Sequence, residues 1–233
     1  EVLRGPQGTL FGSGAMGGAI RMITNEPDPY AFESFGEAIL STTEHGGAGY
    51  ELRAMLNAPS PDNRSAVRAV AYYRDLDGWI DNTFLDHKDV NNDEIGGLRL
   101  SGSWTDQDRL SIIGRFIHQN RASDGSKIDE GKPSWTQQQE VEEPNSDEWS
   151  LANLELNYSF DWGSLISTTA WIDRIADNRL DNSAFYKAVL FPIFVPPPDT
   201  TVSSVTRSDL AQFTQEFRLF SSSDDKLNWL LGL

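Results

Sequence analysis

Three kinds of residue in this chain could do chemistry: glycines that cradle phosphate, carboxylates that hold cations, and histidines that ligate metals. The glycine candidate is Gly12-Ser13-Gly14-Ala15-Met16-Gly17, which has the G-x-G-x-x-G spacing of dinucleotide-binding loops. Such a loop needs a strand before it and a helix after it. Here Gly17-Gly18 would interrupt a helix, and the β-branched Ile20 and Ile23 favour a strand. The sequence therefore disfavours a nucleotide site.

Six aspartates crowd one polar stretch and are the cation candidates. Calcium prefers cages of oxygen ligands, but the spacing of these aspartates is not that of an EF-hand loop. We therefore interpret the stretch as a solvated acidic loop, with a calcium site as the alternative. The aspartates are Asp75, Asp77, Asp81, Asp86, Asp89 and Asp93.

The histidines offer no metal-binding pattern. His45, His87 and His118 are the only three in the sequence, and no two are spaced as ligands on one helical face. The chain has no cysteine and neither a G-x-S-x-G nor an H-E-x-x-H motif. We predict no catalytic residue, no metal site and no cofactor.

Composition narrows the class of partner. The chain has 233 residues with 35 acidic and 19 basic side chains, which gives a formal charge of −16. Nucleic acid demands clustered lysine and arginine, so we expect no nucleic-acid partner. No stretch reaches the ~18 consecutive apolar residues of a transmembrane helix.

Residues 1–27 carry the densest glycine pattern. Glu-Val-Leu-Arg-Gly-Pro-Gln-Gly-Thr-Leu-Phe-Gly is followed, after four residues, by Gly-Gly-Ala-Ile. This order resembles the end of the plug domain of TonB-dependent outer-membrane receptors. Arg21 departs from the pattern, since the family usually has asparagine there. The residues that carry the resemblance are Arg4, Gly5, Pro6, Gly8, Gly12, Gly17 and Gly18.

Beyond Pro29 apolar and polar residues alternate with a period of two, which is typical of strands with one apolar face. In 148–160, for example, Leu154 and Leu156 alternate with Glu155. The segments expected to form strands are 32–43, 48–58, 64–76, 93–104, 109–119, 148–160, 164–174, 211–222 and one beginning near Lys226.

Most of these strands have at least the ~9–11 residues that cross a bilayer at a tilt. Their connections alternate between short and long, as in outer-membrane barrels with short periplasmic turns and long outer loops. We therefore predict an all-β fold, a partial transmembrane antiparallel β-barrel with about nine strands of a roughly 22-stranded barrel. Residues 1–27 would end the plug domain and residues 28–233 would begin the barrel, in a fragment of a longer protein.

Aromatic residues fall near both ends of the predicted strands, where two aromatic belts would meet the membrane interfaces. The alternative is that aromatic residues simply favour strands. One predicted belt comprises Trp104, Phe160, Trp162, Phe220 and Trp229, and the other comprises Tyr73, Phe116, Trp149 and Trp171.

The long loops 120–147 and 175–210 are the predicted ligand contacts, because binding residues concentrate on loops held by a rigid scaffold. Their candidate residues are Trp135, Tyr186, Phe191 and Phe194. The alternative is that the apolar loop residues pack against neighbouring loops. Arg4 of the plug is expected to pair with a carboxylate on the polar, inner face of the barrel sheet, which we call the wall, or else to be solvated. The candidate partners are Glu51, Glu155 and Glu216.

The resemblance implies a receptor in the outer membrane of a Gram-negative bacterium, surrounded by lipid. Its activity would be uptake, not enzymology: a scarce solute, usually a ferric siderophore and sometimes a vitamin or saccharide, binds at the outer loops. The TonB complex would supply energy through a segment upstream of residue 1. One alternative is a soluble β-rich binding module such as a lectin. Another is a barrel enzyme whose catalytic residues lie outside this sequence.

Overall fold

The structure is a computed structural model that describes residues 1–6, 16–125, 135–189, 199–222 and 227–233. It is nearly all β, with 64% strand and 3% helix. The main strands are β3 (Glu33–Thr42), β4 (Ala48–Pro59), β5 (Ser65–Leu76), β7 (Asp93–Thr105), β8 (Leu110–Ser123), β10 (Asn145–Phe160), β11 (Gly163–Asp181), β12 (Ser203–Ser221) and β13 (Leu230–Gly232).

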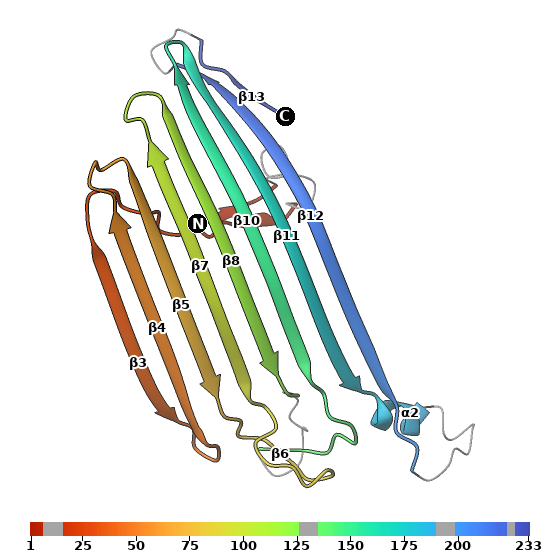
Figure 1. The fold of residues 1–233 in the computed structure, drawn as a ribbon. Helices are drawn as coiled ribbons and strands as arrows, with labels where there is room; N and C mark the ends of the chain where they lie inside the picture. The colour runs from red at the N-terminus through yellow and green to blue at the C-terminus, as the bar shows by residue number, and fades with distance from the viewer. Residues whose placement is uncertain (7–15, 126–134, 190–198, 223–226) are drawn as a thin grey trace.

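These nine strands form one antiparallel sheet in the order β13-β12-β11-β10-β8-β7-β5-β4-β3 (Figure 1). Strands that follow one another along the chain are neighbours in space, and the sheet is not closed. The predicted fold class, part of an antiparallel β-barrel, is confirmed.

Two short strand pairs and one helix lie outside the main sheet. β1 (Val2–Arg4) and β2 (Gly18–Ile20) form an antiparallel ribbon, and β6 (Asp81–Asn82) pairs in parallel with β9 (Thr136–Gln137). The helix α2 spans Ser183–Val189. Among the described residues, no helix is long and apolar enough to cross a membrane.

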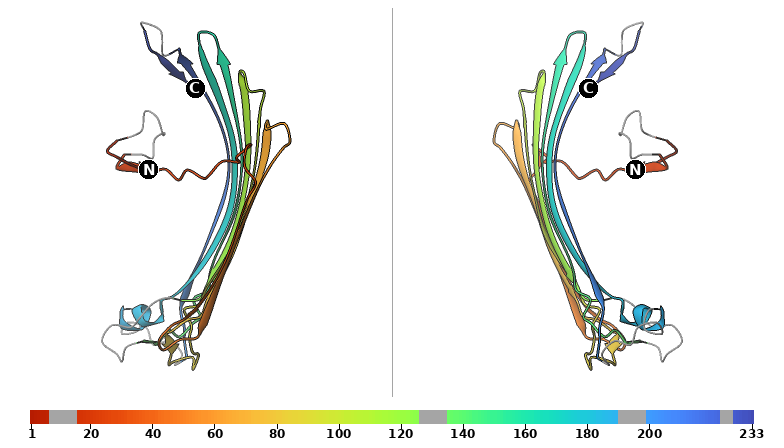
Figure 2. Two further views of the ribbon diagram at one scale, coloured as in Figure 1. Left: turned by 90° about the vertical axis from the view of Figure 1, so that its left-hand side faces the viewer. Right: turned by 90° about the vertical axis from the view of Figure 1, so that its right-hand side faces the viewer.

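The sheet is a single curved layer, and both the N-terminal segment and α2 lie on its concave side (Figure 2). Within the described residues, Ala66 and Ile80 are the only fully buried apolar side chains. A two-layer sandwich would bury many more between its sheets. The architecture is therefore not a two-layer sandwich.

The contact between Arg115 and Glu26 identifies the concave face of the wall. Glu26 belongs to the N-terminal segment, and its carboxylate lies 2.9 Å from the Arg115 guanidinium on β8. The register is continuous across the sheet, so every second residue of each strand shares the face of Arg115. Concave side chains include Arg53, Arg68, Arg74, Arg99, Arg115, Arg121, Arg174 and Arg218.

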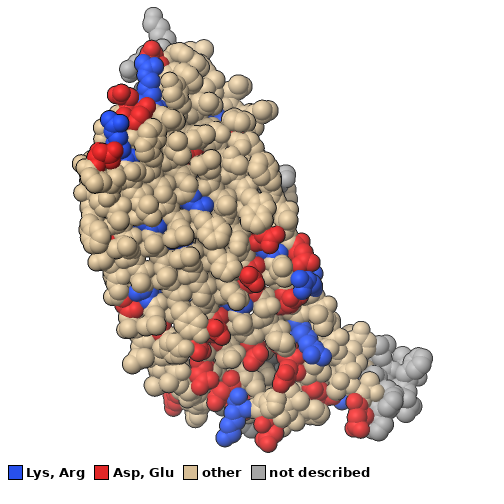
Figure 3. Space-filling view, in the orientation of Figure 1, with Lys and Arg blue, Asp and Glu red and all other residues tan. Residues whose placement is uncertain are grey.

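The convex face is apolar over most of its height. Figure 3 views this face and shows a broad band largely free of charge, with charged side chains gathered toward its two ends. The band consists of alternate residues of each strand that point away from the N-terminal segment. Its members include Leu98, Leu100, Trp104, Ile112, Phe116, Leu154, Leu156, Leu165, Phe213 and Phe217.

Short and long connections lie at opposite ends of the sheet (Figure 1). The short turns are 60–64, 106–109 and 161–162, and the long connections are 77–92, 124–144 and 182–202. The tight β3–β4 hairpin turn, residues 43–47, lies at the long-loop end. The alternation of connection lengths predicted from the sequence is confirmed.

Several strand bounds were wrong, chiefly at the long-loop end. β11 continues to Asp181 and β12 begins at Ser203, where the sequence suggested one loop over 175–210. The extensions are polar on both faces, but their charges pair across the ladder: Arg207 lies 3.3 Å from Asp177. Residues 183–189 form α2, and the N–H of its first residue, Ser183, donates to the Asp181 carboxylate at 2.8 Å.

The predicted aromatic belts are partly wrong, because Trp149 and Phe220 lie on the concave face. Distance from a turn sets the height of a residue in the wall, whereas the parity of its position sets the face. On the short-turn end the convex residues do form a stack. The ring centroids lie 4.7 Å apart for Tyr158 and Phe160, 5.0 Å for Phe160 and Trp162, and 6.2 Å for Trp162 and Trp229.

Candidate functional site

Two long loops are joined at the loop end of the sheet. The β6–β9 bridge pairs Asp81 with Thr136 and Asn82 with Gln137, so the β5–β7 loop and the β8–β10 loop form one unit. The Asp81 N–H donates to the Trp135 carbonyl at 2.9 Å. This bond fixes Trp135 beside the neighbouring loop.

Buried amides hold this unit together. Asn91 Oδ1 accepts the backbone N–H groups of Trp79 and Ile80 at 2.7 and 2.8 Å. Asn82 Nδ2 donates to the Gln139 carbonyl at 2.9 Å, and Asn82 itself is only 2% exposed. Because buried amides with satisfied bonds fix backbone positions, the loops provide a preformed frame, on which the six aspartates are half-buried or exposed.

An aromatic cleft of about 500 Å³ opens where three connections meet. It is lined by Thr43, Glu44 and His45 of the hairpin turn, Trp79 of the β5–β7 loop and Trp135 of the β8–β10 loop. The ring centroids of His45 and Trp135 lie 6.4 Å apart with 25° between their planes. We call this the aromatic cleft.

Backbone geometry brings the hairpin turn to the cleft. His45 and Trp135 both have positive φ, 64° and 71°, which non-glycine residues rarely adopt. A Cβ on Gly46 would collide with the Gly78 carbonyl oxygen, so the turn packs directly on the neighbouring loop. The close packing of Gly46 on Gly78 thus places the hairpin turn, with His45, beside the loop that carries Trp79.

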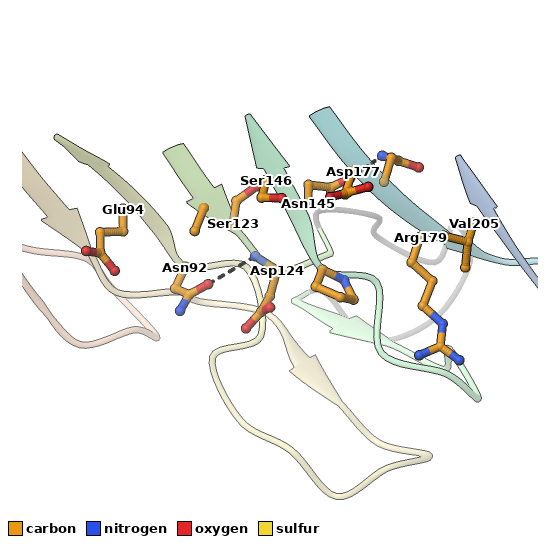
Figure 4. Close-up of a pocket in the computed structure, with 12 residues that line it drawn as sticks. Asn92, Glu94, Ser123, Asp124, Asn145, Ser146, Asp177, Arg179 and Val205 are labelled. Atoms are coloured by element: carbon orange, nitrogen blue, oxygen red, sulfur yellow. Dashed lines mark hydrogen bonds between the residues drawn. The ribbon is translucent and has the colours of Figure 1, made fainter. Parts of the chain in front are cut away.

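A second cavity of about 480 Å³ lies on the outer side of the wall at the same end (Figure 4). Its lining includes Glu94, Asp124, Asp177 and Arg179, and the Asp124 N–H donates to Asn92 Oδ1 at 3.1 Å. Burial, together with the nearby Glu142, raises the pKa of Asp124. Glu94 and Asp177 occupy convex positions, so this cavity does not face the space that the N-terminal segment occupies.

Contacts with Arg115 and Asn57 attach the N-terminal segment to the concave face. Arg115 contacts Glu26 at 2.9 Å, Asn153 at 3.0 Å and Glu155 at 3.4 Å. Asn57 is fully buried and hydrogen bonds to the backbone of residues 28 and 31. The ion pair with Glu26 joins a wall arginine to a carboxylate of the segment, whereas the pairing predicted from the sequence joins Arg4 of the segment to a carboxylate of the wall.

The glycine-rich ribbon is held by its own backbone. Gly18 has φ 139°, and a Cβ there would lie 2.5 Å from the Leu3 carbonyl oxygen, so the β1–β2 pair needs glycine at this position. Arg21 lies 3.5 Å from the Glu1 carboxylate, which extends the ribbon by one ion pair. Of the predicted plug-motif residues, Gly8 and Gly12 lie outside the described residues.

The three predicted wall glutamates all occupy concave positions. Glu155 lies 3.4 Å from Arg115, Glu51 contacts Arg53, and Glu216 contacts Arg218. Arg4 pairs with Gly18 in the β1–β2 ribbon. Pairing of Arg4 with a wall carboxylate stays a prediction.

The structure describes two of the four predicted ligand residues, Trp135 and Tyr186. Trp135 lines the aromatic cleft, whereas Tyr186 lies in α2 with its ring centroid 5.7 Å from that of Phe185. Phe191 and Phe194 lie outside the described residues. Sequence reasoning missed Trp79 and His45 as partners of Trp135; each was visible only as a single aromatic residue in a turn-rich stretch. No group of metal ligands is present in the part of the chain that the structure describes.

No family model matches the chain. Among solved structures, the chain is similar to the ferric yersiniabactin uptake receptor FyuA from Yersinia pestis. The TM-score is 0.70 at 18% identity, and the match covers 99% of this chain but only 34% of that one. The chain has the fold of part of that receptor. It spans about a third of the receptor's length.

Proposed function

We propose that the chain belongs to a TonB-dependent outer-membrane receptor that takes up a scarce solute. One observation carries the proposal: a single curved wall has an apolar convex face and a charged concave face with the glycine-rich N-terminal segment attached. A wall of this kind suits a barrel in lipid with an occupied interior. The plug-like motif of residues 1–27 and the similarity to FyuA support the same function.

The apolar convex band supports a location in the outer membrane. Residues such as Leu154 and Phe213 are 44% and 66% exposed, which in water would be an extended apolar surface. Lipid would cover this band, while the backbone bonds of the sheet remain satisfied between strands. The stacked aromatics from Tyr158 to Trp229 would then lie at the interface on the short-turn side.

In this proposal residues 1–27 end a plug domain, and residues 28–233 begin the barrel. The short turns face the periplasm and the long loops face outward. Uptake draws on the TonB complex, which engages a segment upstream of this sequence. A ferric siderophore is the first substrate class to test, since FyuA is named for one, followed by vitamins and saccharides.

The test is uptake of labelled solutes by intact cells. The gene for the full protein is deleted, restored on a plasmid, and restored in a strain that also lacks TonB. Uptake that returns only when both the protein and TonB are present supports the proposal. If every tested iron, vitamin and saccharide source enters the deletion strain at the wild-type rate, the proposal fails.

A solubility test separates the proposal from the lectin-like alternative. The full protein should remain monodisperse only in detergent or lipid, because its convex band must be covered. A protein that is monodisperse in buffer without detergent contradicts the membrane location.

A further inference from the structure

We infer that the aromatic cleft binds a solute that carries a ring with an apolar face and no net negative charge. This inference rests on the proposed function and specifies its substrate class. Two indole rings from different loops, Trp79 and Trp135, line the same 500 Å³ space, with His45 stacked against Trp135. Aromatic faces of this kind stack on planar arenes and on the apolar faces of sugar rings.

The cleft is preformed, which favours binding over simple loop packing. Trp79 is held through its backbone by Asn91, and Trp135 is held by the Asp81 N–H. The neighbouring rings nevertheless leave the Trp135 side chain 43% exposed. The indole is therefore accessible to a molecule that enters the cleft.

The edges of the cleft offer hydrogen-bonding groups beside the rings. Thr43 has a hydroxyl, Glu44 a carboxylate and His45 an imidazole. These groups are suited to hydroxyl-bearing rings, such as a pyranose or a phenol. The shared chemistry is therefore a ring with an apolar face and with hydroxyl groups at its edge.

Charge excludes an anionic ring. The connections 43–47, 77–92 and 124–144 contain eleven acidic residues and three lysines, and their described parts contain nine acidic residues and one lysine, Lys88. Glu44 lines the cleft itself, and the Asp77 carboxylate lies against Gly47 of the hairpin turn that carries His45. The nine acidic residues of the described parts are Glu44, Asp77, Asp81, Asp86, Asp89, Asp124, Glu140, Glu142 and Glu143.

This field acts on approach and on binding. At physiological ionic strength the repulsion between exposed charges is screened over about 8 Å, so it acts mainly close to the cleft. A ferric tris-catecholate complex has suitable rings but several negative charges, and we expect the cleft to reject it. Rejection should weaken with added salt, because salt screens the repulsion between exposed charges.

The test measures binding to the full protein in detergent by isothermal titration, with four probes. A neutral gluco-oligosaccharide and a neutral flavonoid have suitable rings and no charge. A ferric tris-catecholate has suitable rings and negative charge. A neutral ferric hydroxamate has no such ring. We expect binding of at least one neutral ring, and its identity separates sugar from arene. Trp79→Ala and Trp135→Ala should each weaken that binding about tenfold.

Trp162→Phe is the matched control, since Trp162 lies in the aromatic stack at the short-turn end, far from the cleft, and should leave binding unchanged. The inference is overturned if the ferric tris-catecholate binds more tightly than both neutral rings at low salt. It is also overturned if neither neutral ring binds at millimolar concentration, or if both tryptophan variants bind like wild type. TonB-dependent uptake of the anionic complex would overturn this inference and leave the proposed function standing. Tryptophan-dependent binding without TonB-dependent uptake would support this inference and overturn the proposed function.

Discussion

The side chain of Asn57 bonds to both backbone groups of Asp28. Its Oδ1 accepts the Asp28 N–H at 2.9 Å, and its Nδ2 donates to the Asp28 carbonyl at 2.8 Å and to the Ala31 carbonyl at 2.6 Å. Asn57 is 0% exposed. An amide is suited to this position because it carries both a donor and an acceptor. The contact fixes the direction in which the N-terminal segment enters β3.

Replacing Asn57 with alanine should therefore loosen the junction. Each buried backbone group left without a partner costs about 1–3 kcal/mol. We expect a lower free energy of unfolding in urea and faster hydrogen exchange at the Asp28 amide. Asn157→Ala is the matched control, since Asn157 Oδ1 is buried on the same face without a hydrogen-bond partner among the described residues. Equal effects of the two substitutions would contradict the role assigned to Asn57.

Alternation in the sequence predicted the wall well, because one face of each strand is apolar and the other polar. β4, β5 and β7 fall within a residue or so of the predicted segments. Alternation gave no signal in the extensions of β11 and β12, where both faces carry polar residues. Arg207 and Asp177 pair across β11 and β12, yet in the sequence alone such charges indicate a loop.

The aromatic cleft could be predicted only in part. Trp135 stood out as an aromatic residue in a polar loop, but its partners come from connections that meet through the β6–β9 bridge. That bridge has two residues on each side and leaves no periodic signal. Asn57 and Arg115 were equally invisible, since their partners lie 29 and 89 residues away.

Tyr72 and Gly97 are matched across the concave face. A Cβ at Gly97 would lie 2.5 Å from Tyr72 Cζ, and the Tyr72 hydroxyl reaches over this glycine to donate to Gln119 Oε1 at 2.6 Å. Gly97→Ala should displace the ring and lower the free energy of unfolding by about 1–3 kcal/mol.

Gly102→Ala is the control, because no atom lies within 4 Å of a Cβ built there. It should be neutral or stabilise the strand by up to about 1 kcal/mol. In a Tyr72→Ala background the cost of Gly97→Ala should largely disappear. If that cost persists without the ring, the clash with Tyr72 is not its cause.

Asp106 should make the β7–β8 turn sensitive to acid. The pKa of its carboxyl lies below the ordinary value because the carboxylate accepts the backbone N–H groups of Leu110 and Arg109, both at 2.8 Å. A lowered pKa in the folded state stabilises the fold above the ordinary pKa of about 4, and this contribution is lost as the pH falls through the folded-state value.

Asp106→Ala should therefore be less stable than wild type at pH 7, and the difference should shrink as the pH falls below about 4. Chemical unfolding of the full protein in detergent at a series of pH values measures it. Asp108→Ala, in the same turn, controls for the loss of one negative charge. A stability difference that is independent of pH would show that the hydrogen bonds of the carboxylate are not the cause.

Ile112 and Ile113 are adjacent on β8 but face opposite sides of the wall. Ile112 pairs with Trp104 and Leu156 on the convex face, whereas Ile113 pairs with Ser103 and Glu155 on the concave face. If lipid covers the convex band, Ile112→Arg should lower the stability, but by less than the about 2–4 kcal/mol of an arginine at the bilayer midplane, because Ile112 lies beside Trp104 near the short-turn end. Ile113→Arg should be tolerated, because Glu155 offers a partner in a polar interior. Folding of the full protein into lipid vesicles, followed by urea titration, compares the two. Equal tolerance of arginine at both positions would mean that the convex face does not contact lipid.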